Sequence, residues 1–437
     1  MPQRTTPPHL LIHAGGLADA EGRTNAPGSL LIDRSGPEPA ILAAGEPGVV
    51  ARHPAADGAE VIHRPGAVLI PALVNAHTHL DLTHLGPIPF GPTETFTSWA
   101  MHVIRGRVSD AEAITASVRD GIARSIRGGV AAVGDIAGVC RLEPTVALRE
   151  SPLEGVSYHE VFGLGPEEQQ GIDRLTWLAD RGTEVPPVVD RGVTLGSSPH
   201  APYSAGPSLQ AAAAQLQRDP GLPACTHLSE CPEELEFIAS ATGPVRDLLH
   251  ALGGWDDALA AHLGRGERPI AHVAEALETA PILVAHVNSV TDDEIAHLAR
   301  TGTRVVYCPR SSTYFRNHEH FGPHRYREML DAGISVCLGT DSVLNHPPEQ
   351  ADRLTTLDEM RFLFARDGVS AELVLRMATT AGAVALGLDP ARFTLAPGPI
   401  AGVLAIEVDA DGASIDARAA VLQAATLPEW IVGAGAS

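Results

Sequence analysis

Lysine is absent from this chain. All 31 basic side chains among its 437 residues are arginines. The absence excludes chemistry that needs a lysine amine, such as a Schiff base with a carbonyl substrate or a phosphate-binding loop lysine. It also excludes a bridge between two metal ions made from a carboxylated lysine. Any reaction that this protein performs must therefore use other side chains.

Paired cysteines and long apolar segments are also missing. The five cysteines are scattered and form no Cys-x-x-Cys pair, which is typical of reduced thiols in a cytosolic protein. Residues 1–15 have no signal-peptide pattern, and no apolar run approaches the roughly 18–20 residues that span a bilayer. We therefore expect a cytoplasmic location. The cysteines are Cys140, Cys225, Cys231, Cys308 and Cys337.

The charge balance narrows the range of partners. The formal net charge is −22 at pH 7, which argues against a basic surface for nucleic acid or anionic membranes. With 44% hydrophobic and 19% charged residues, the chain has the composition of a folded protein with a sizeable core. We expect a small-molecule substrate, with neither a nucleic acid nor a membrane as partner.

Eight short apolar runs organise the middle of the chain, and alanine-rich helical patterns separate most of them. This alternation predicts an α/β fold in which strand–helix units close into a (β/α)₈ barrel. An open doubly wound sheet is the alternative, but no Gly-x-Gly-x-x-Gly turn follows a run. The runs cover residues 67–74, 129–136, 155–162, 192–199, 222–228, 281–287, 303–309 and 334–340, and helices are expected over 110–128, 232–241, 292–300 and 370–386.

The two ends of the chain have a different pattern. Residues 1–66 contain short strand-like runs, such as 10–13 and 29–32, separated by glycine and proline turns. Residues 396–437 are similar, with a strand candidate at 403–408. Both ends are therefore expected to form strands outside the repeating strand–helix pattern.

Polar side chains follow the eight runs, where the C-terminal strand ends of such a barrel carry the chemistry. The first run leads into His77-Thr78-His79, and alternate residues of an extended chain share a face, so both imidazoles could converge on one ion. His318, His320 and His324 lie in a later loop and are expected to be solvated. The other strand-end residues are Asp135, His159, Glu160, His200, His227, Glu230, His286, Arg310 and Asp341.

The order of these residues resembles the amidohydrolase superfamily. The resemblance rests on His77-Thr78-His79, His227, His286 and Gly339-Thr340-Asp341. It implies a hydrolase barrel over residues 67–395 and a small composite β-sandwich made from residues 1–66 and 396–437. Barrels of this family are often dimers or larger homo-oligomers.

The resemblance also implies one metal ion. Without lysine the usual two-metal form is excluded, and the spacing His227-x-x-Glu230 is similar to the mononuclear deaminase branch. The implied ligands of one divalent ion are His77, His79, His227 and Asp341. Zn²⁺ is expected, and Fe²⁺ suits the same nitrogen and oxygen donors.

A bound ion of this kind lowers the pKa of its water towards about 7 and so generates hydroxide at neutral pH. Asp341 can take the water proton, Glu230 can protonate a ring nitrogen, and His286 can hydrogen-bond the attacking hydroxide. Two plainer readings stay open. Glu230 could be an ordinary acid at a helix start, and His286 could be a further metal ligand.

Further motifs resemble those of nucleoside deaminases. Residues 198–203 are similar to a motif of adenosine-type deaminases, and residues 96–99, 159–163 and 308–312 look like the aminodeoxyfutalosine deaminases of the alternative menaquinone route. The likeness implies loss of the 6-amino group of an adenine-type nucleoside. Residues implied to contact the substrate are Trp99, Glu160, His200 and Arg310.

Several points stay open at this stage. Arg310 could pair with a substrate carboxylate or brace the barrel rim, and Trp99 could stack on the base or be a buried rim aromatic. Many relatives have a Ser-Asn pair after Gly-Thr-Asp, whereas here Asn345 follows three residues after Ser342.

Three other functions compete with the aminodeoxyfutalosine reading. One is a methylthioadenosine or adenosylhomocysteine deaminase. Another is an s-triazine or other heterocycle amidohydrolase or chlorohydrolase. The third, a non-catalytic metal-stabilised scaffold, is disfavoured because every implied catalytic position holds a competent side chain.

Overall fold

The computed structural model describes residues 7–22, 24–138, 141–182, 192–219, 221–256, 259–261, 263–408 and 416–436. The chain divides into two compact units, which are described separately. The first comprises Met1–Asn75, Ala123–Ala132 and Arg353–Ser437, and the second comprises Ala76–Ile122 and Val133–Asp352.

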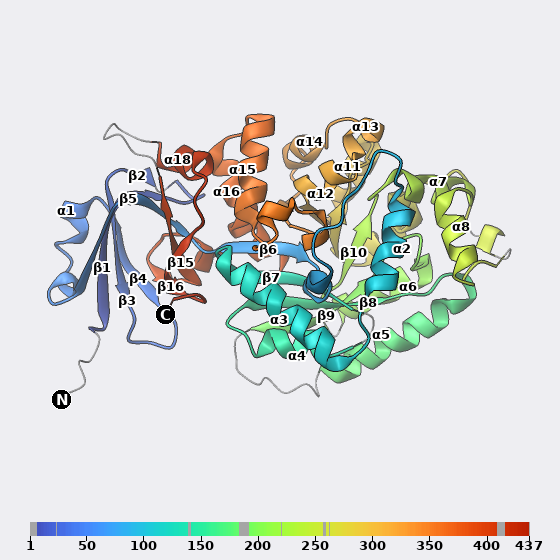
Figure 1. Ribbon diagram of the computed structural model, residues 1–437, viewed down its shortest axis with the longest axis horizontal. Coiled ribbons are helices and arrows are strands. Elements are labelled where there is room, and N and C mark those ends of the chain that lie inside the picture. The colour runs from blue at the N-terminus through green and yellow to red at the C-terminus, as the bar shows by residue number, and fades with distance from the viewer. Residues whose placement is uncertain are drawn as a thin grey trace. The chain divides into compact units, whose positions relative to one another are not determined.

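The first unit contains a sheet that joins strands from both ends of the chain (Figure 1). Its order is β14-β4-β3-β1-β5-β15-β16, with β2 paired to β1. The sheet confirms the expected strands at both ends, while a separate β-sandwich domain with the expected boundaries stays a prediction. The strands are β1 (His9–Ala18), β2 (Thr24–Asn25), β3 (Gly28–Asp33), β4 (Ala40–Gly45), β5 (Glu60–Pro71), β14 (Gly398–Pro399), β15 (Gly402–Glu407) and β16 (Glu429–Gly433).

Apolar side chains from the two ends share the core of this sheet. Leu10 and Ile12 of β1 and Leu69 of β5 lie in one cluster with Val403 of β15 and Val432 of β16, all of them buried. Strand β15 pairs antiparallel with β5 from Val403↔Pro71 to Glu407↔Ala67. The two ends therefore bury each other's apolar faces, which neither could do alone.

Two four-stranded sheets carry the eight predicted runs. One has the order β6-β7-β8-β9 and the other β10-β11-β12-β13. Each of the last seven runs overlaps one of these strands, whereas the first run, 67–74, covers the end of β5 and only the start of β6. The mixed α/β class is confirmed. The strands are β6 (Leu73–Thr78), β7 (Val130–Ala137), β8 (Glu154–Val161), β9 (Val193–Pro199), β10 (Cys225–Leu228), β11 (Leu283–His286), β12 (Arg304–Tyr307) and β13 (Val336–Leu338).

Two single parallel bridges connect the two sheets. Ser197 of β9 pairs with Ala224 beside β10, and Thr78 of β6 pairs with Asp341 beyond β13. The first run was predicted to end at residue 74, but the chain bends between β5 and β6 and the strand continues to Thr78. His77 therefore lies inside β6 rather than after it.

Helices follow most strands, as their sequence signals predict. In α11 (Asp292–Thr301), Thr291 caps the first turn by accepting from the amide of Glu294, and Gly302 ends the helix with φ +69°. The expected helix over 370–386 is instead two helices, α16 (Ala371–Ala378) and α17 (Thr380–Ala385), separated at Thr379. Other helices are α3 (Ala111–Arg127), α5 (Glu168–Gly182), α6 (Pro207–Arg218) and α7 (Pro232–Ser240).

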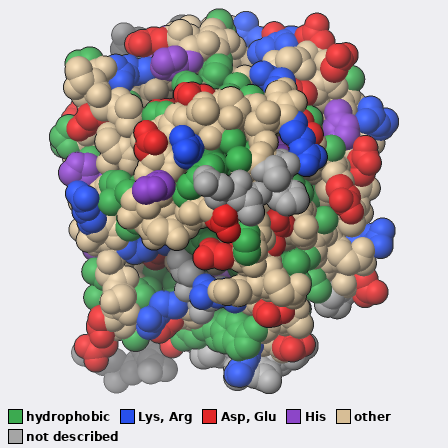
Figure 2. Space-filling model, turned by 90° about the vertical axis from the view of Figure 1, so that its right-hand side faces the viewer, with side chains coloured by type: hydrophobic (Ala, Val, Ile, Leu, Met, Phe, Trp, Pro, Cys, Tyr) green, Lys and Arg blue, Asp and Glu red, His purple; other side chains and the backbone are tan. Residues whose placement is uncertain are grey.

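The charge distribution on the surface and the state of the cysteine thiols can be compared with the expectations from the sequence. In the face shown in Figure 2, arginines and acidic side chains are interspersed and form no basic patch. Within the described ranges, no helix combines the length and apolarity needed to cross a membrane. Cys225, Cys231, Cys308 and Cys337 are buried free thiols, and Cys140 lies outside the described residues.

Candidate metal and catalytic site

The C-terminal end of β6 and the segment that follows β13 meet at the centre of the site. The amides of Thr340 and Asp341 both donate to the carbonyl oxygen of His77 at 3.0 Å, and the amide of His79 donates to that of Asp341 at 3.1 Å. A Cβ on Gly339 would lie 2.8 Å from that of His77, so only glycine fits there. This explains why the sequence Gly-Thr-Asp stands opposite His-Thr-His.

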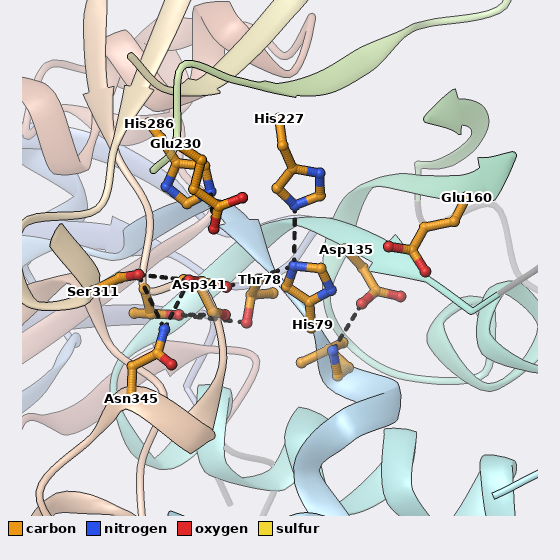
Figure 3. Close-up of polar contacts among 12 residues, drawn as sticks. Thr78, His79, Asp135, Glu160, His227, Glu230, His286, Ser311, Asp341 and Asn345 are labelled. Atoms are coloured by element: carbon orange, nitrogen blue, oxygen red, sulfur yellow. Dashed lines mark hydrogen bonds and ion pairs between the residues drawn. The ribbon is translucent and has the colours of Figure 1, made fainter. Parts of the chain in front are cut away.

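Four imidazoles from three strands, β6, β10 and β11, gather at this point. The His77 ring lies 5.2 Å from that of His79, 4.9 Å from that of His227 and 5.3 Å from that of His286, measured between centroids. His79 Nε2 is 3.4 Å from His227 Nε2 and 3.5 Å from Asp341 Oδ1, as Figure 3 shows. The structure therefore brings the four implied metal ligands together.

The donor set fits a divalent cation. Both ring nitrogens of His77 and Nδ1 of His79 are buried without a hydrogen-bond partner. Burial lowers the pKa of His77 well below its usual value and that of His79 to about 3, so both rings are neutral and their lone pairs are free to bind. Buried nitrogen donors around a carboxylate are the usual environment of Zn²⁺, and a cation would satisfy atoms that the protein leaves unpaired.

Hydrogen bonds around the ligands fix their orientation. His227 Nδ1 lies 2.8 Å from the carbonyl oxygen of His200, which leaves Nε2 facing the cluster. Asp341 Oδ2 accepts from the Ser311 hydroxyl at 2.6 Å and from the Asn345 amide at 2.7 Å, which leaves Oδ1 towards His79. Asn345, whose place in the sequence departs from relatives, therefore still holds the aspartate.

Glu230 and His286 lie beside the four ligands. Glu230 Oε1 is 3.5 Å from His286 Nε2, and both residues can meet Asp341 at a common point. Burial, together with the negative charges of Asp341, Glu234 and Glu233, raises the pKa of Glu230 well above its usual value. The protonated form of the carboxyl group is therefore favoured, and this form can donate a proton.

Several residues at these strand ends have left-handed backbone conformations. The φ angles are +51° at Ser229, +74° at His286, +52° at Val287 and +58° at Asp341. Such angles cost free energy in residues other than glycine and are found where surrounding contacts enforce them, often at functional sites. One of those contacts comes from His324, whose Nε2 lies 2.8 Å from the carbonyl oxygen of His286. The expectation of a solvated residue is wrong for His324, which is half-buried, whereas His318 and His320 are exposed.

A cavity of about 230 Å³ opens onto the site. Trp99, Glu160 and His200 line it together with His79, His227, Glu230 and Asp341. Helices α2 (Phe96–Gly106) and α8 (Pro244–Ala251) supply apolar walls, including Phe96, Val103, Ile104, Val245, Leu248 and Leu249. The cavity therefore has a polar floor and an apolar outer part.

Three of the strand-end residues, Arg310, His159 and Asp135, are absent from the described lining of this cavity and form contacts elsewhere. The Arg310 guanidinium donates to Gln350 Oε1 at 2.7 Å and lies 3.1 Å from His346 Nε2, and Arg310 is not among the lining residues described. These contacts favour the reading in which Arg310 braces the structure. His159 is buried with Nε2 2.6 Å from the Thr145 hydroxyl. Asp135 accepts from the amide of Leu80 at 3.0 Å, and burial raises its pKa to about 8.

Arg107 is a cavity residue that the sequence did not reveal. Its Nη1 donates to Glu160 Oε2 at 2.9 Å and its Nη2 lies 3.2 Å from Asp81 Oδ2. Burial opposes ionisation of Glu160, but the charge of Arg107 outweighs it and lowers the pKa of Glu160 to about 2. His200 Nε2 lies 3.7 Å from the other Glu160 oxygen. Arg107 follows a helix rather than a strand, so no strand-end pattern could identify it.

Comparison with known proteins shows the family to which the chain belongs. The amidohydrolase family profile matches residues 68–424, and the chain belongs to this family. It is 31% identical to an aminodeoxyfutalosine deaminase of Deinococcus radiodurans over 361 residues, which cover 79% of this chain and 81% of the relative. The chain is therefore a hydrolase that acts on carbon–nitrogen bonds other than peptide bonds, of the deaminase type.

Two further similarities are informative. A 5-methylthioadenosine/S-adenosylhomocysteine deaminase of Halobacterium salinarum is 26% identical over 91% of this chain and 84% of its own. The crystal structure of an atrazine chlorohydrolase from Arthrobacter aurescens complexed with zinc has a TM-score of 0.71 and 20% identity over 98% of this chain and 94% of that one. The second likeness shows the shared fold.

Removing one imidazole from the cluster should remove the metal. Such a site holds about one ion per chain. We expect His77→Gln to lose most of this metal, because His77 faces three other rings. His159→Gln is the matched control, since His159 is also buried at a strand end but bonds to Thr145. Metal content measured by plasma mass spectrometry would contradict the assignment if both variants retained the ion.

Removing Arg107 should destabilise the protein in a pH-dependent way. Arg107→Met leaves Glu160 buried without its cation, a change that typically costs about 3–5 kcal/mol. The folded pKa of Glu160 is about 2, below its unfolded value, so its stabilisation is full above that unfolded value and is lost as the pH falls towards 2. The difference in melting temperature from wild type should be large at neutral pH and smaller in acid.

Arg119→Met is the control for this experiment. Arg119 and Glu150 form a 2.9 Å pair with side chains 62% and 41% exposed, so the loss should be at most about 1 kcal/mol. Thermal unfolding of all three proteins measures the effect. Equal losses in both variants, or a loss that grows in acid, would be incompatible with a buried Arg107–Glu160 pair.

Proposed function

We propose that this protein is a metal-dependent aminohydrolase that replaces the 6-amino group of an adenine-type nucleoside, with aminodeoxyfutalosine as the favoured substrate. The observation that carries the proposal is the position of a buried Glu230, whose pKa is raised and whose Oε1 lies 3.5 Å from His286 Nε2, beside the imidazole cluster. We also propose that the ring of eight strands is a closed (β/α)₈ barrel, since two bridges connect its two sheets.

The implied metal would be held by His77, His79, His227 and Asp341, and Zn²⁺ or Fe²⁺ suits them. When bound, such an ion makes water acidic enough to attack at neutral pH. Glu230 holds a proton that it can give to the ring nitrogen next to the amino-bearing carbon, which makes that carbon electrophilic. Asp341 accepts a proton from water through Oδ1, because Ser311 and Asn345 occupy its other oxygen.

His286 completes this arrangement. Its backbone is held because its carbonyl oxygen is bonded to His324, and among the described residues its Nε2 has no partner other than the nearby Glu230 carboxyl. It can therefore hydrogen-bond the oxygen that adds to the ring and stabilise the tetrahedral centre. Ammonia then leaves after the proton that Asp341 took from water reaches the amino group, and the proton of the added hydroxyl group restores that of Glu230.

The shape of the cavity supports a nucleoside with an apolar substituent. The polar floor suits a purine ring, while the outer walls from α2 and α8 are apolar. Arg107 is already paired with two carboxylates, so the described walls offer little to a zwitterionic amino acid tail. The walls therefore favour methylthioadenosine over adenosylhomocysteine, and the preference for aminodeoxyfutalosine, which carries a carboxylate, rests on the named relatives.

The named relatives support aminodeoxyfutalosine as the favoured substrate. The relative that is 31% identical is an aminodeoxyfutalosine deaminase, and one at 26% acts on methylthioadenosine and adenosylhomocysteine. Action on aminodeoxyfutalosine would place the protein in menaquinone biosynthesis, and the buried free thiols support a cytoplasmic location. A triazine hydrolase is the second candidate, and only the shared fold favours it.

Ammonia release from a panel of compounds tests the proposed function. Metal-loaded protein should deaminate aminodeoxyfutalosine with a kcat/KM about tenfold or more above that for methylthioadenosine, a difference of about 1.4 kcal/mol. Adenosylhomocysteine should be poorer and atrazine inert. Absence of ammonia from every nucleoside would refute the proposal, and turnover of atrazine alone would favour the second candidate.

Changing Glu230 separates metal binding from catalysis. Glu230→Gln should keep the metal but lower kcat by about 10²–10⁴-fold, because the amide cannot transfer the proton. Glu236→Gln, an exposed change in the same region of α7, should behave as wild type. Steady-state kinetics with measured metal content would exclude Glu230 from the reaction if its variant kept full activity.

A further inference from the structure

Two adjacent acids open helix α7 and contact two different parts of the cavity. Glu233 and Glu234 follow Pro232 in the first turn of α7. Both resemble ordinary helix-start acids, which favour the positive end of the helix dipole. Their contacts differ, however, because Glu234 is fully buried and turned towards Glu230, whereas Glu233 reaches the start of α2.

Glu234 holds the backbone that carries Glu230. One of its carboxylate oxygens accepts from the amide of Ser229 at 3.0 Å, and the other accepts from the amide of Glu230 at 2.6 Å. Asn288 holds the opposite side, since its side-chain amide donates to the carbonyl oxygen of Glu230 at 2.9 Å. These bonds fix a segment in which Ser229 has the unfavourable φ of +51°.

Two donors on two oxygens require a carboxylate at this position. A glutamine at residue 234 would offer one oxygen to one backbone amide and point its own NH₂ group at the other. Because the site is buried, the second amide would lose its acceptor, which disturbs the segment locally. The catalytic carboxyl of Glu230 would then shift relative to His286 and Asp341.

Glu233 has a different target. Its Oε1 accepts from the amide of Phe96 at 3.0 Å, at the first residue of α2. The neighbouring residues Thr95 and Ser98 form a capping box with each other, so they satisfy other donors of that helix start. Glu233 therefore anchors the helix whose Phe96 and Trp99 side chains line the cavity.

We propose that Glu233 and Glu234 are positioning residues with separate tasks, in which Glu233 holds the substrate-binding wall α2 and Glu234 holds the proton donor Glu230. The proposal rests on the proposed function for its kinetic consequence. Neither acid is expected to touch the substrate. The two therefore differ in the step that each supports, although they are neighbours in sequence.

The kinetic test is a crossed pattern. Glu234→Gln should lower kcat about 10–100-fold with KM within about threefold, since misplacing a reacting group by about 1 Å costs that much. Glu233→Ala should raise KM about tenfold with kcat within about threefold. The reason is that it weakens binding of the substrate equally in the ground state and in the transition state. Glu233→Gln should be close to wild type, since the one oxygen that Phe96 uses is retained.

Hydrogen exchange provides a readout that does not depend on turnover. Glu234→Gln should speed amide exchange in the segment 229–231, and Glu233→Ala should speed it at the start of α2. Glu236→Ala, in the same helix but exposed, is the control and should change neither. Metal content and melting temperature of each variant show whether the fold is intact.

The outcomes distinguish this inference from the proposed function. Wild-type protein that releases no ammonia from any nucleoside contradicts the function, and the exchange pattern then still decides the positioning roles. The division of tasks would be overturned if Glu234→Gln and Glu233→Ala changed kcat and KM in the same way. It would also be overturned if amide exchange changed in the same segments in both variants. A crossed pattern in both measurements supports it.

Discussion

The structure depends on a group of buried imidazoles that cannot carry charge. Burial keeps His77 and His79 neutral, and both ring nitrogens of His77 and Nδ1 of His79 have no hydrogen-bond partner within the described part of the protein. A buried polar atom without a partner costs free energy, so this arrangement needs an external cation to be satisfied. The strand order, the glycine at residue 339 and the bonds to Asp341 all serve to hold these donors at the meeting point of the first and last strands.

Around this centre, the site separates into groups with different charge states. Arg107 lies against Glu160 and lowers its pKa to about 2, whereas burial and neighbouring acids raise the pKa of Glu230 and favour its protonated form. Two carboxyl groups in one cavity can therefore act differently, one as a fixed acceptor and the other as a proton donor. The division follows from the location of a single arginine, which reaches Glu160 and Asp81.

Much of this could be predicted from the sequence because strand periodicity is a local property. The eight apolar runs became strands, and His77, His79, His227, Glu230, His286 and Asp341 came together because parallel strands end at one edge. Arg107, Asn345, His324 and Glu234 could not be predicted, since each acts through a tertiary contact that no spacing encodes. For Arg310 the sequence left two alternatives open, and only the tertiary contact with Gln350 favours the one in which it braces the structure.

The central claim is that the imidazole cluster binds one cation through His77, His79, His227 and Asp341, with Glu230 left free as an acid. Anomalous X-ray diffraction from crystals of zinc-loaded protein tests it most directly. The account predicts one peak about 2.0–2.2 Å from a nitrogen of each histidine and an oxygen of Asp341, with Glu230 outside that distance. Two peaks, or one peak bound by Glu230 and His286 instead, would contradict it.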